Sequence, residues 1–259
     1  MAEASTIEKL QIRIYGTASL PTLIYLPGLH GDWTIIGDFR KHVTGKARFV
    51  EFTYPRSLTW SLDDYAEAIE NLLVQNGITG GWLLGESYGS QIAWMLAARQ
   101  KISVEAIILA GGFVKYPMPG GVWFARHSLK LFPLRLLIWL LVAYGKIARL
   151  RYRKAPETLR ALNEFLARRT ELDKQAAVHR LDQIAAFDPR QIVRQLRQPV
   201  YYLSASLDPV VPYFPVRHWL RKNCPAFREA KSIPTFDHNI LATAHIRCAR
   251  QIVDWMLSR

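Results

Sequence analysis

Three residues in widely separated segments are of the types that together make a nucleophile for acyl transfer. Ser87 lies in "GESYGS", Asp208 in "SLDPVVP" and His238 in "PTFDHNIL". A serine hydroxyl stays protonated at neutral pH, so it attacks a carbonyl well only beside a base, and that base needs an acid to orient it. The sequence therefore predicts Ser87 as nucleophile, Asp208 as acid and His238 as base.

The glycines around Ser87 fit a sharp turn from a strand into a helix. Such a turn forces its central residue into unfavourable backbone angles and crowds the positions two before and two after it. Gly85 and Gly89 meet that need, and Ser90 keeps the next position small. A Gly-x-Ser-x-Gly pattern alone would occur by chance in about one chain in ten of this length, and Ser87 would then be an ordinary loop residue. Its interpretation therefore depends on the acid and the base.

The glycine-rich segment "PGLHGDW", which follows the apolar run "TLIYL", is the candidate for an oxyanion-binding loop. A serine nucleophile needs two backbone N–H groups directed at the negative oxygen that forms on the substrate. Tyr88, directly after the nucleophile, is predicted to supply one, and Leu29 the other. The alternative is that this segment is only a flexible connection. His30 and Trp33 of the segment, together with Glu86, are predicted to contact the substrate.

The carboxylates near these segments also have simpler explanations. Asp208 is a typical turn former before Pro209, but the loop after the apolar run "VEAIILA" holds no carboxylate that would replace it. Asp237 neighbours His238 in the chain, and adjacent side chains rarely point at each other. Asp188 in "FDPR" is predicted to cap a helix. Asp208 is therefore the preferred acid.

The chain alternates short apolar runs with longer helical patterns, which favours a mostly parallel sheet with helices on both faces. Several runs are apolar almost throughout, as expected of strands buried on both sides. The predicted strands are 10–16, 22–26, 47–54, 81–85, 104–110, 199–205 and 227–233. Ligands of such a sheet bind beyond the carboxyl ends of the strands, and Ser87, Asp208 and His238 each follow a predicted strand.

Helical patterns occupy the segments between the strands. In "SLDDYAEAIENLLVQNG" Ser61 is the predicted N-cap, with Asp64 three residues later, and Gly77 ends the helix. Further helices are predicted directly after the Ser87 turn and at the end of the chain. Residues 113–188 are helix-like and basic, with no convincing strand. They are predicted to form an inserted helical lid over the site.

The composition indicates one globular unit with an uneven charge. Of the 259 residues 50% are hydrophobic, and the net charge is +13. Residues 113–180 hold fourteen Lys or Arg against four Asp or Glu, which indicates a solvated basic surface, an anionic substrate or an anionic membrane. No nucleic-acid-binding module accompanies the charge, so nucleic acid is not an expected partner. Two cysteines without metal or disulfide spacing, and a start without a signal-peptide pattern, favour a cytoplasmic protein.

Residues 129–154 combine an apolar run with basic residues. The run from Leu136 to Tyr144 is far shorter than the ~20 residues that span a bilayer. The segment therefore either packs as a cap helix over the strand ends or lies in a membrane interface. In the second case anionic headgroups would meet Lys146, Arg149, Arg151, Arg153 and Lys154. The turn before it is a hinge or a fixed turn, made by Pro117, Pro119, Gly120 and Gly121.

With these residues assigned, the sequence resembles the α/β-hydrolase superfamily over nearly its whole length. The segments "YLPGLHGDW", "LLGESYGSQIAWMLAAR", "VEAIILAGGF", "LRQPVYYLSASLDPVVP" and "FDHNILAT" follow the order and approximate spacing of that superfamily. The loop "LPGLHGDW" differs from the commoner His-Gly form and looks like the Leu-Pro-Gly-Leu variant of some bacterial esterase-like members. The resemblance implies an α/β core at 1–112 and 189–259, a helical cap at 113–188, and the same nucleophile, acid and base.

A serine nucleophile on this fold points to acyl transfer. The expected activity is hydrolysis of a carboxylic ester or thioester with a hydrophobic acyl or alcohol part, and it needs no metal and no organic cofactor. The superfamily also contains lyases, dehalogenases, peroxidases and members without catalysis. An acyltransferase or lyase with the same triad, and a non-catalytic binding protein, therefore remain alternatives. The oligomeric state stays open.

Overall fold

The structure is a computed structural model that describes residues 9–118, 120–133, 135–136, 164, 169–235 and 237–258. Its centre is a seven-stranded sheet in the order β1-β3-β2-β4-β5-β6-β7. The strands are β1 (Gln11–Tyr15), β2 (Thr22–Leu26), β3 (Arg48–Thr53), β4 (Gly80–Glu86), β5 (Ser103–Ala110), β6 (Val200–Ala205) and β7 (Phe227–Ile233). Each predicted strand is present within one residue of its expected ends, so the predicted α/β fold is confirmed.

The direction of the strands determines where a site can form. All neighbouring strands run parallel, except that β1 is antiparallel to β3 at one edge. The side chains at the carboxyl ends of the central strands β2, β4 and β5 are buried. Because the parallel strands point the same way, the loops after β2, β4, β6 and β7 meet at one edge of the sheet.

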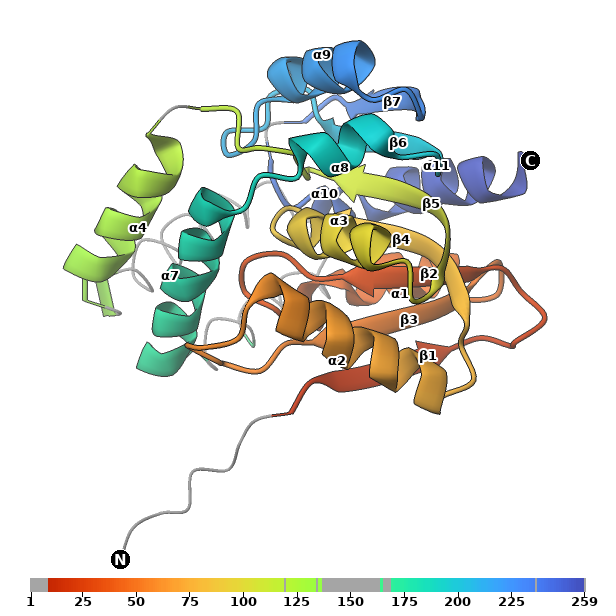
Figure 1. Cartoon of the computed structure of the whole chain (residues 1–259), viewed down its shortest axis with the longest axis horizontal. Helices are drawn as coiled ribbons and strands as arrows, with labels where there is room; N and C mark the ends of the chain where they lie inside the picture. Colours follow the sequence, from red (N-terminus) through yellow and green to blue (C-terminus); the bar gives the residue numbers. More distant parts are fainter. Residues whose placement is uncertain are drawn as a thin grey trace, which may run out of the picture.

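Helices cover both faces of the sheet (Figure 1). One face is covered by α2 (Leu62–Gln75), α3 (Gly89–Arg99), α8 (Arg190–Gln195) and α9 (Tyr213–Asn223). The other is covered by α1 (Gly37–Val43), α10 (Ile240–Thr243) and α11 (His245–Leu257). Each face has its own buried hydrophobic cluster, which explains why most strands are apolar on both sides.

Local hydrogen bonds set the start of α2. The Ser61 hydroxyl accepts from the Asp64 N–H at 3.1 Å, and the Asp64 carboxylate accepts from the Ser61 N–H at 2.7 Å. These two bonds form the capping box that joins the predicted N-cap to the residue three positions later. Gly77, with φ +67°, follows the end of the helix.

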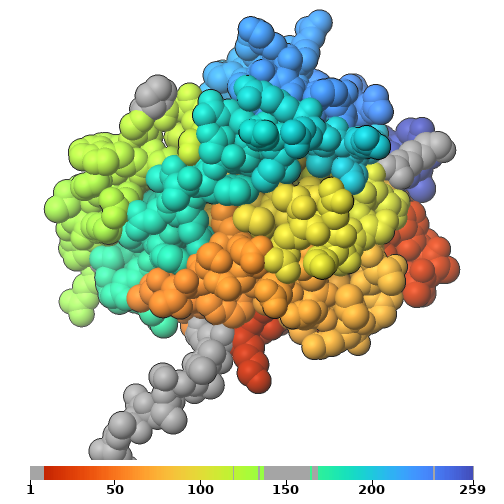
Figure 2. Space-filling view, in the orientation of Figure 1, coloured from red at the N-terminus to blue at the C-terminus, as the bar shows by residue number. Residues whose placement is uncertain are grey.

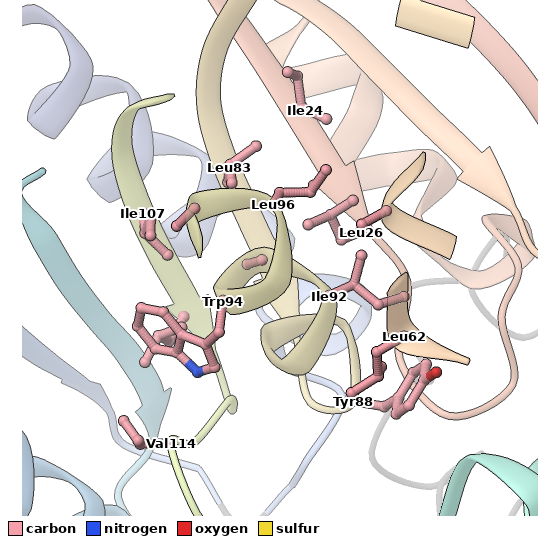
Figure 3. Packing of buried hydrophobic residues seen from close by; sticks show 14 of the residues in the cluster. Ile24, Leu26, Leu62, Leu83, Tyr88, Ile92, Trp94, Leu96, Ile107 and Val114 are labelled. Atoms are coloured by element: carbon pink, nitrogen blue, oxygen red, sulfur yellow. The ribbon is translucent and has the colours of Figure 1, made fainter. Parts of the chain in front are cut away.

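Helix α3, which begins just after the Ser87 turn, is buried along most of its length. Figure 3 shows its Ile92, Trp94 and Leu96 among side chains of β2, β4 and β5. The indole N–H of Trp94 donates to the carbonyl of Phe113 at 2.9 Å. This packing fixes the start of α3 and therefore the turn that precedes it.

Two described helices lie within the predicted insertion at 113–188. They are α4 (Gly121–Leu131) and α7 (Glu171–Ala186), and they lie side by side at one end of the molecule (Figure 1). Together they form the surface of the molecule on that side (Figure 2). Leu181 and Ile184 of α7 belong to the same buried cluster as α2 and α3. Helix α7 therefore shares the packing of the core.

Much of the predicted basic cap falls outside the described residues. This applies to 137–144, to Pro119 of the hinge or turn, and to Lys146, Arg149, Arg151, Arg153 and Lys154. The predicted domain boundaries remain a prediction. Among the residues that are described, no helix combines the length and the apolar character needed to cross a bilayer.

Candidate active site

Ser87, His238 and Asp208 form one chain of hydrogen bonds at the carboxyl edge of the sheet. His238 Nε2 lies 2.9 Å from Ser87 Oγ, and His238 Nδ1 lies 2.8 Å from Asp208 Oδ2. The three residues follow β4, β7 and β6, respectively. A carboxylate only accepts hydrogen bonds, so Nδ1 carries the proton and Nε2 offers its lone pair to the serine hydroxyl. This arrangement lets a histidine take the proton of an attacking serine.

Ser87 has the backbone of a sharp strand-to-helix turn. Its φ of +48° lies in a region that non-glycine residues rarely adopt, and such strain costs about 1–3 kcal/mol. A Cβ at Gly85 would lie 2.8 Å from Ser90 Cα, and one at Gly89 would lie 2.1 Å from the carbonyl oxygen of Leu26. The two glycines therefore leave the room that the turn needs.

The Asp208 carboxylate accepts hydrogen bonds from four groups. Oδ1 accepts from the N–H groups of Val210 and Val211, each at 2.8 Å. Oδ2 accepts from the Ser204 hydroxyl at 3.2 Å as well as from His238. Burial of a carboxylate is tolerated where hydrogen bonds replace water. These four bonds supply that replacement and hold the acid in one orientation toward the histidine.

Gly111, in the loop after β5, leaves space for the His238–Asp208 pair. Its φ is +57°, and its N–H donates to the carbonyl of Leu203 at 2.8 Å. A Cβ there would lie 3.2 Å from His238 Cε1 and 3.4 Å from Asp208 Oδ2. A side chain at this position would therefore press on the pair, in addition to straining the backbone.

The loop after β2 runs beside the nucleophile. A Cβ at Gly28 would lie 3.6 Å from Ser87 Cβ, so the loop and the turn are in van der Waals contact. Leu29 comes next in this loop and lines the same cavity as Ser87. Tyr88 is the N-cap residue of α3, and its side chain is buried in the core (Figure 3). Of the two residues predicted to supply oxyanion N–H groups, Leu29 thus shares the cavity with Ser87, and Tyr88 directly follows Ser87 in the chain.

A cavity of about 400 Å³ opens next to Ser87, with a lining that is more apolar than polar. Clefts of this size accommodate small organic ligands. It is lined by Gly28, Leu29, His30, Gly31, Asp32, Ile35, Glu86, Ser87, Pro209, Val210, Asp237, His238 and Asn239. Ile35 and Asn239 were not predicted as lining residues. Asn239 is next to His238 in the chain, whereas nothing in the sequence marks Ile35.

The structure brings His30 and Glu86 to this cavity, but not Trp33. Trp33 lines a neighbouring polar cavity, and the Arg13 guanidinium lies 3.9 Å from the centroid of its ring. The indole therefore packs against β1 and not against a substrate at Ser87. Its predicted contact with substrate has no support from the structure.

Glu86, directly before the nucleophile, is a buried carboxyl with few partners. The Tyr25 hydroxyl donates to its Oε2 at 2.5 Å, and Oε1 has no hydrogen-bond partner. Desolvation raises the pKa of Glu86, although the Tyr25 hydrogen bond and the nearby His238 oppose this effect. Because Oε1 is not exposed, Glu86 contributes to the floor of the cavity more than to a polar contact with substrate.

His30 lies between the two cavities, close to two guanidinium groups. Desolvation of the imidazole and the charges of Arg169 and Arg180 lower the pKa of His30. The ring is therefore neutral at pH 7, with one donor and one acceptor nitrogen.

Within the described ranges, no group of three or more His, Cys, Asp or Glu side chains is arranged to hold a metal ion.

A comparison with family models matches residues 51–244 to the family described as "alpha/beta hydrolase fold". A search of curated proteins finds no significant match.

Solved structures with a similar fold cover almost the whole chain. The esterase RhEst1 from Rhodococcus sp. ECU1013 has a TM-score of 0.76 and 19% identity, and the match covers 96% of this chain and 94% of that one. The enol-lactonase from Burkholderia xenovorans LB400 has a TM-score of 0.76 and 16% identity, covering 95% and 96%. MGS-M2, an alpha/beta hydrolase enzyme from a Medee basin deep-sea metagenome library, has a TM-score of 0.77 and 16% identity, covering 96% and 94%. At these identities the likeness concerns the fold.

Proposed function

The chain belongs to the α/β-hydrolase family, and on this basis we propose that it is a serine hydrolase that cleaves a carboxylic ester or thioester through an acyl-enzyme on Ser87. The observation that supports the proposal most is the unbroken hydrogen-bond chain from Ser87 through His238 to Asp208. Backbone strain at Ser87 supports it too, since strained residues concentrate where a side chain must be presented to a ligand.

In the proposed acylation step, Ser87 Oγ attacks the carbonyl carbon of the substrate while its proton moves to His238 Nε2. The electron pair of the C=O π bond moves to the oxygen and gives a tetrahedral oxyanion. His238 then gives the proton to the leaving oxygen or sulfur as its bond to carbon breaks. The alcohol or thiol leaves, and the acyl group stays on Ser87.

Deacylation repeats these steps with water in place of the serine. His238 takes a proton from the water that attacks the acyl carbon, and returns it to Ser87 Oγ as the free acid forms. Asp208 keeps the imidazole in one tautomer and stabilises its charged form. The N–H groups of Leu29 and Tyr88 are assigned to the oxyanion, and one such donor contributes about 2.7–4 kcal/mol to the transition state.

The apolar lining of the cavity supports a substrate with a hydrophobic acyl or alcohol part. Leu29, Ile35, Pro209 and Val210 supply apolar surface next to the nucleophile. His30 adds a polar side chain to this lining. None of the proposed steps requires a metal or an organic cofactor.

An acyltransferase would use the same acyl-enzyme and a different acceptor, and a lyase would use the same base. A non-catalytic binding protein would not need an activated serine. Product analysis separates the first two from a hydrolase, because only hydrolysis in ¹⁸O-water places the label in the free acid. Covalent labelling of Ser87 separates all of these enzymes from a binding protein.

We also propose that α4 brings the protein to an anionic lipid surface. Trp123, Phe124 and Leu131 on this helix are 62%, 69% and 77% exposed. Lys130 lies in the last turn of the helix, next to Leu131 in the chain, and the first turn of α4 contains no acidic residue. Exposed aromatic and aliphatic side chains next to cations are typical of helices that lie in a membrane interface.

Vesicle flotation tests this second proposal. The wild-type protein is expected to float with vesicles that contain phosphatidylglycerol and to remain unbound with phosphatidylcholine alone. The double variant Trp123→Ser, Phe124→Ser is expected to lose flotation without losing its fold. Equal flotation of the wild type and the variant would contradict a role for α4.

The first experiment for the proposed function is labelling with a fluorophosphonate probe, followed by intact-mass measurement. One adduct is expected on the wild-type chain and none on Ser87→Ala or His238→Ala. Turnover of p-nitrophenyl butyrate by Ser87→Ala is expected to fall by at least about 10⁴-fold, because the covalent route is lost.

Ser19→Ala, which replaces an exposed serine in the connection between β1 and β2, is the matched control and should be labelled like the wild type. Circular dichroism of each variant checks that the fold is intact. A folded wild-type chain without an adduct would contradict the proposed function, and so would full labelling of Ser87→Ala.

A further inference from the structure

The guanidinium of Arg180, on α7, contacts the loop after β2 that contains Leu29. Arg180 is 2% exposed, which is rare for an arginine. Its Nη1 donates to the carbonyl of Leu29 at 2.8 Å, and its Nη2 donates to the carbonyl of Pro55 at 3.0 Å. One guanidinium thus joins the loop after β2 to the loop after β3.

The surroundings of Arg180 leave room for its guanidinium, although its buried Nε has no hydrogen-bond partner among the described residues. Gly31 has φ +75°, and a Cβ there would lie 2.7 Å from Arg180 Nη1. The guanidinium lies 5.5 Å from the ring centroid of Tyr54 and 6.0 Å from that of Tyr65. Aromatic faces compensate part of the cost of burying a cation. The oxyanion loop is therefore shaped around a side chain that comes from the insertion.

One turn further along α7, Gln183 contacts the other residue of the proposed oxyanion hole. Its Oε1 accepts a hydrogen bond from the Tyr88 hydroxyl. Its amide N–H donates to the carbonyl of Trp60, which His179 Nε2 also contacts at 2.9 Å. The phenol of Tyr88 is otherwise enclosed in the hydrophobic core. Gln183 therefore anchors the hydroxyl end of the Tyr88 side chain.

We infer that helix α7 positions the oxyanion hole: Arg180 holds Leu29 and Gln183 holds Tyr88, the two residues whose main-chain N–H groups would stabilise the tetrahedral intermediate. This inference rests on the proposed function. Arg180 and Gln183 contact neither substrate nor reacting atoms in this scheme, so they are positioning residues. The part of the chain predicted as a lid also supports the catalytic groups from behind.

The physical reason is the steep dependence of oxyanion stabilisation on geometry. The donors must lie 2.7–3.1 Å from the position that the charged oxygen will occupy, and a displacement of about 0.5 Å already weakens such a site. The charged oxygen exists only in the transition state and the intermediate. Loosening the donors therefore lowers kcat and leaves KM nearly unchanged.

Two conservative variants test this inference. Arg180→Lys keeps the charge but replaces the two-pronged donor with a single flexible ammonium. Tyr88→Phe removes only the hydroxyl that bonds to Gln183. We expect kcat for p-nitrophenyl butyrate to fall about 10–100-fold in Arg180→Lys and about 3–10-fold in Tyr88→Phe, with KM within about twofold of the wild type. The rate of fluorophosphonate labelling should fall in parallel.

The inhibition constant of a transition-state analogue is a measurement that a loss of stability alone would not change. n-Butylboronic acid forms a tetrahedral adduct with an active serine and places an oxygen in the oxyanion site. Its inhibition constant should rise by the same factor as kcat falls, whereas that of butyrate, a ground-state ligand, should change little.

Arg56→Gln is the matched control. Arg56 Nε donates to Asp173 at 2.7 Å, so it also ties the core to α7, but at the far end of the helix from Gln183. This variant should lose stability, measured as Tm, while keeping kcat and boronate affinity. Tm of every variant is measured by circular dichroism. If Arg180→Lys fails to fold, Tyr88→Phe alone decides the outcome, because it preserves the buried ring.

If Arg180→Lys folds and keeps its kcat and boronate affinity, the inference is overturned. If Arg180→Lys does not fold, the same result in Tyr88→Phe overturns it. In either case labelling of the wild type leaves the proposed function standing. An equal fall of kcat in Arg56→Gln would also overturn it, since any loosening of α7 would then suffice. A wild-type chain without labelling would overturn both.

Discussion

The loop after β6 places a buried carboxyl group against His238, and the end of β4 places another directly before Ser87, but only the first is surrounded by hydrogen-bond donors. Asp208 and Glu86 are 6% and 5% exposed. Asp208 accepts hydrogen bonds from two backbone N–H groups, a serine hydroxyl and His238. Glu86 accepts one from Tyr25, and its other oxygen has no partner. Equal burial is thus combined with four hydrogen bonds at Asp208 and one at Glu86.

The comparison shows that two equally buried carboxyl groups can differ in the number of hydrogen-bond donors around them, and that this number decides which of them can orient a histidine. Hydrogen bonds to the ionised form favour it, and desolvation without them favours the neutral form. Asp208 has the bonds that an orienting anion needs. Glu86, whose pKa desolvation raises, has the surroundings of a group that holds its proton more tightly. Three substitutions would break or sharpen this contrast.

Asp208→Asn is expected to have the largest effect of the three. The amide cannot fix the histidine tautomer that leaves Nε2 free, so kcat should fall by about 10³–10⁴-fold while KM changes little. Steady-state kinetics with p-nitrophenyl butyrate measure the change. Asp237→Asn is the control, because Asp237 is the rival carboxylate and lines the cavity next to Ser87. This variant should retain activity within about tenfold. The opposite ranking would assign the acid to Asp237.

Glu86→Gln is expected to change stability more than rate. A carboxyl group with a raised pKa favours the fold below its unfolded pKa of about 4.3, and that contribution is lost as pH rises through the pKa of the folded state. Glutamine does not titrate. The stability of the variant relative to the wild type should therefore increase as pH rises above about 4.

Urea unfolding at several pH values between about 4 and 8 measures this difference. A variant that loses stability relative to the wild type with rising pH would show that the Glu86 carboxylate is favoured in the folded state. Its kcat should stay within about tenfold of the wild type, because Glu86 makes no hydrogen bond to the triad in the described contacts.

Ser204→Ala should have the smallest effect. It removes the longest of the four bonds to Asp208, at 3.2 Å, and leaves the two backbone donors in place. We expect kcat to fall about two- to fivefold, in line with the loss of one hydrogen bond worth about 1 kcal/mol. A fall comparable to that of Asp208→Asn would mean that the hydroxyl, and not the backbone, holds the acid.

The strands and the three reactive segments were predictable because their signals are local. Each strand is a short apolar run bounded by turn residues, and Gly85 and Gly89 are required by contacts within a few ångströms of Ser87. Because the strands run parallel, the three segments that follow them then meet at one edge of the sheet. Asp208 was also favoured as the candidate acid because the loop after β5 offers Gly111 and no carboxylate.

The contacts of α7 and the orientation of Trp33 were not predictable in this way. Arg180 looks like one more charge in a basic segment, because its acceptors are main-chain carbonyls at Leu29 and Pro55, which no side-chain pattern reveals. Trp33 is the last residue of the segment "PGLHGDW", but its contact with the Arg13 guanidinium depends on the position of β1. Long-range contacts of this kind require the fold itself.

The packing of α7 has a consequence for engineering by lid exchange. Enzymes of one fold invite chimaeras in which the inserted segment of one member replaces that of another. In this protein the transplantable part would have to end before Glu171, because the helix that follows carries Leu181 and Ile184 of the core cluster and the hydrogen bonds of Arg180. A graft that extends to residue 188 would replace part of this protein's hydrophobic core along with its predicted lid.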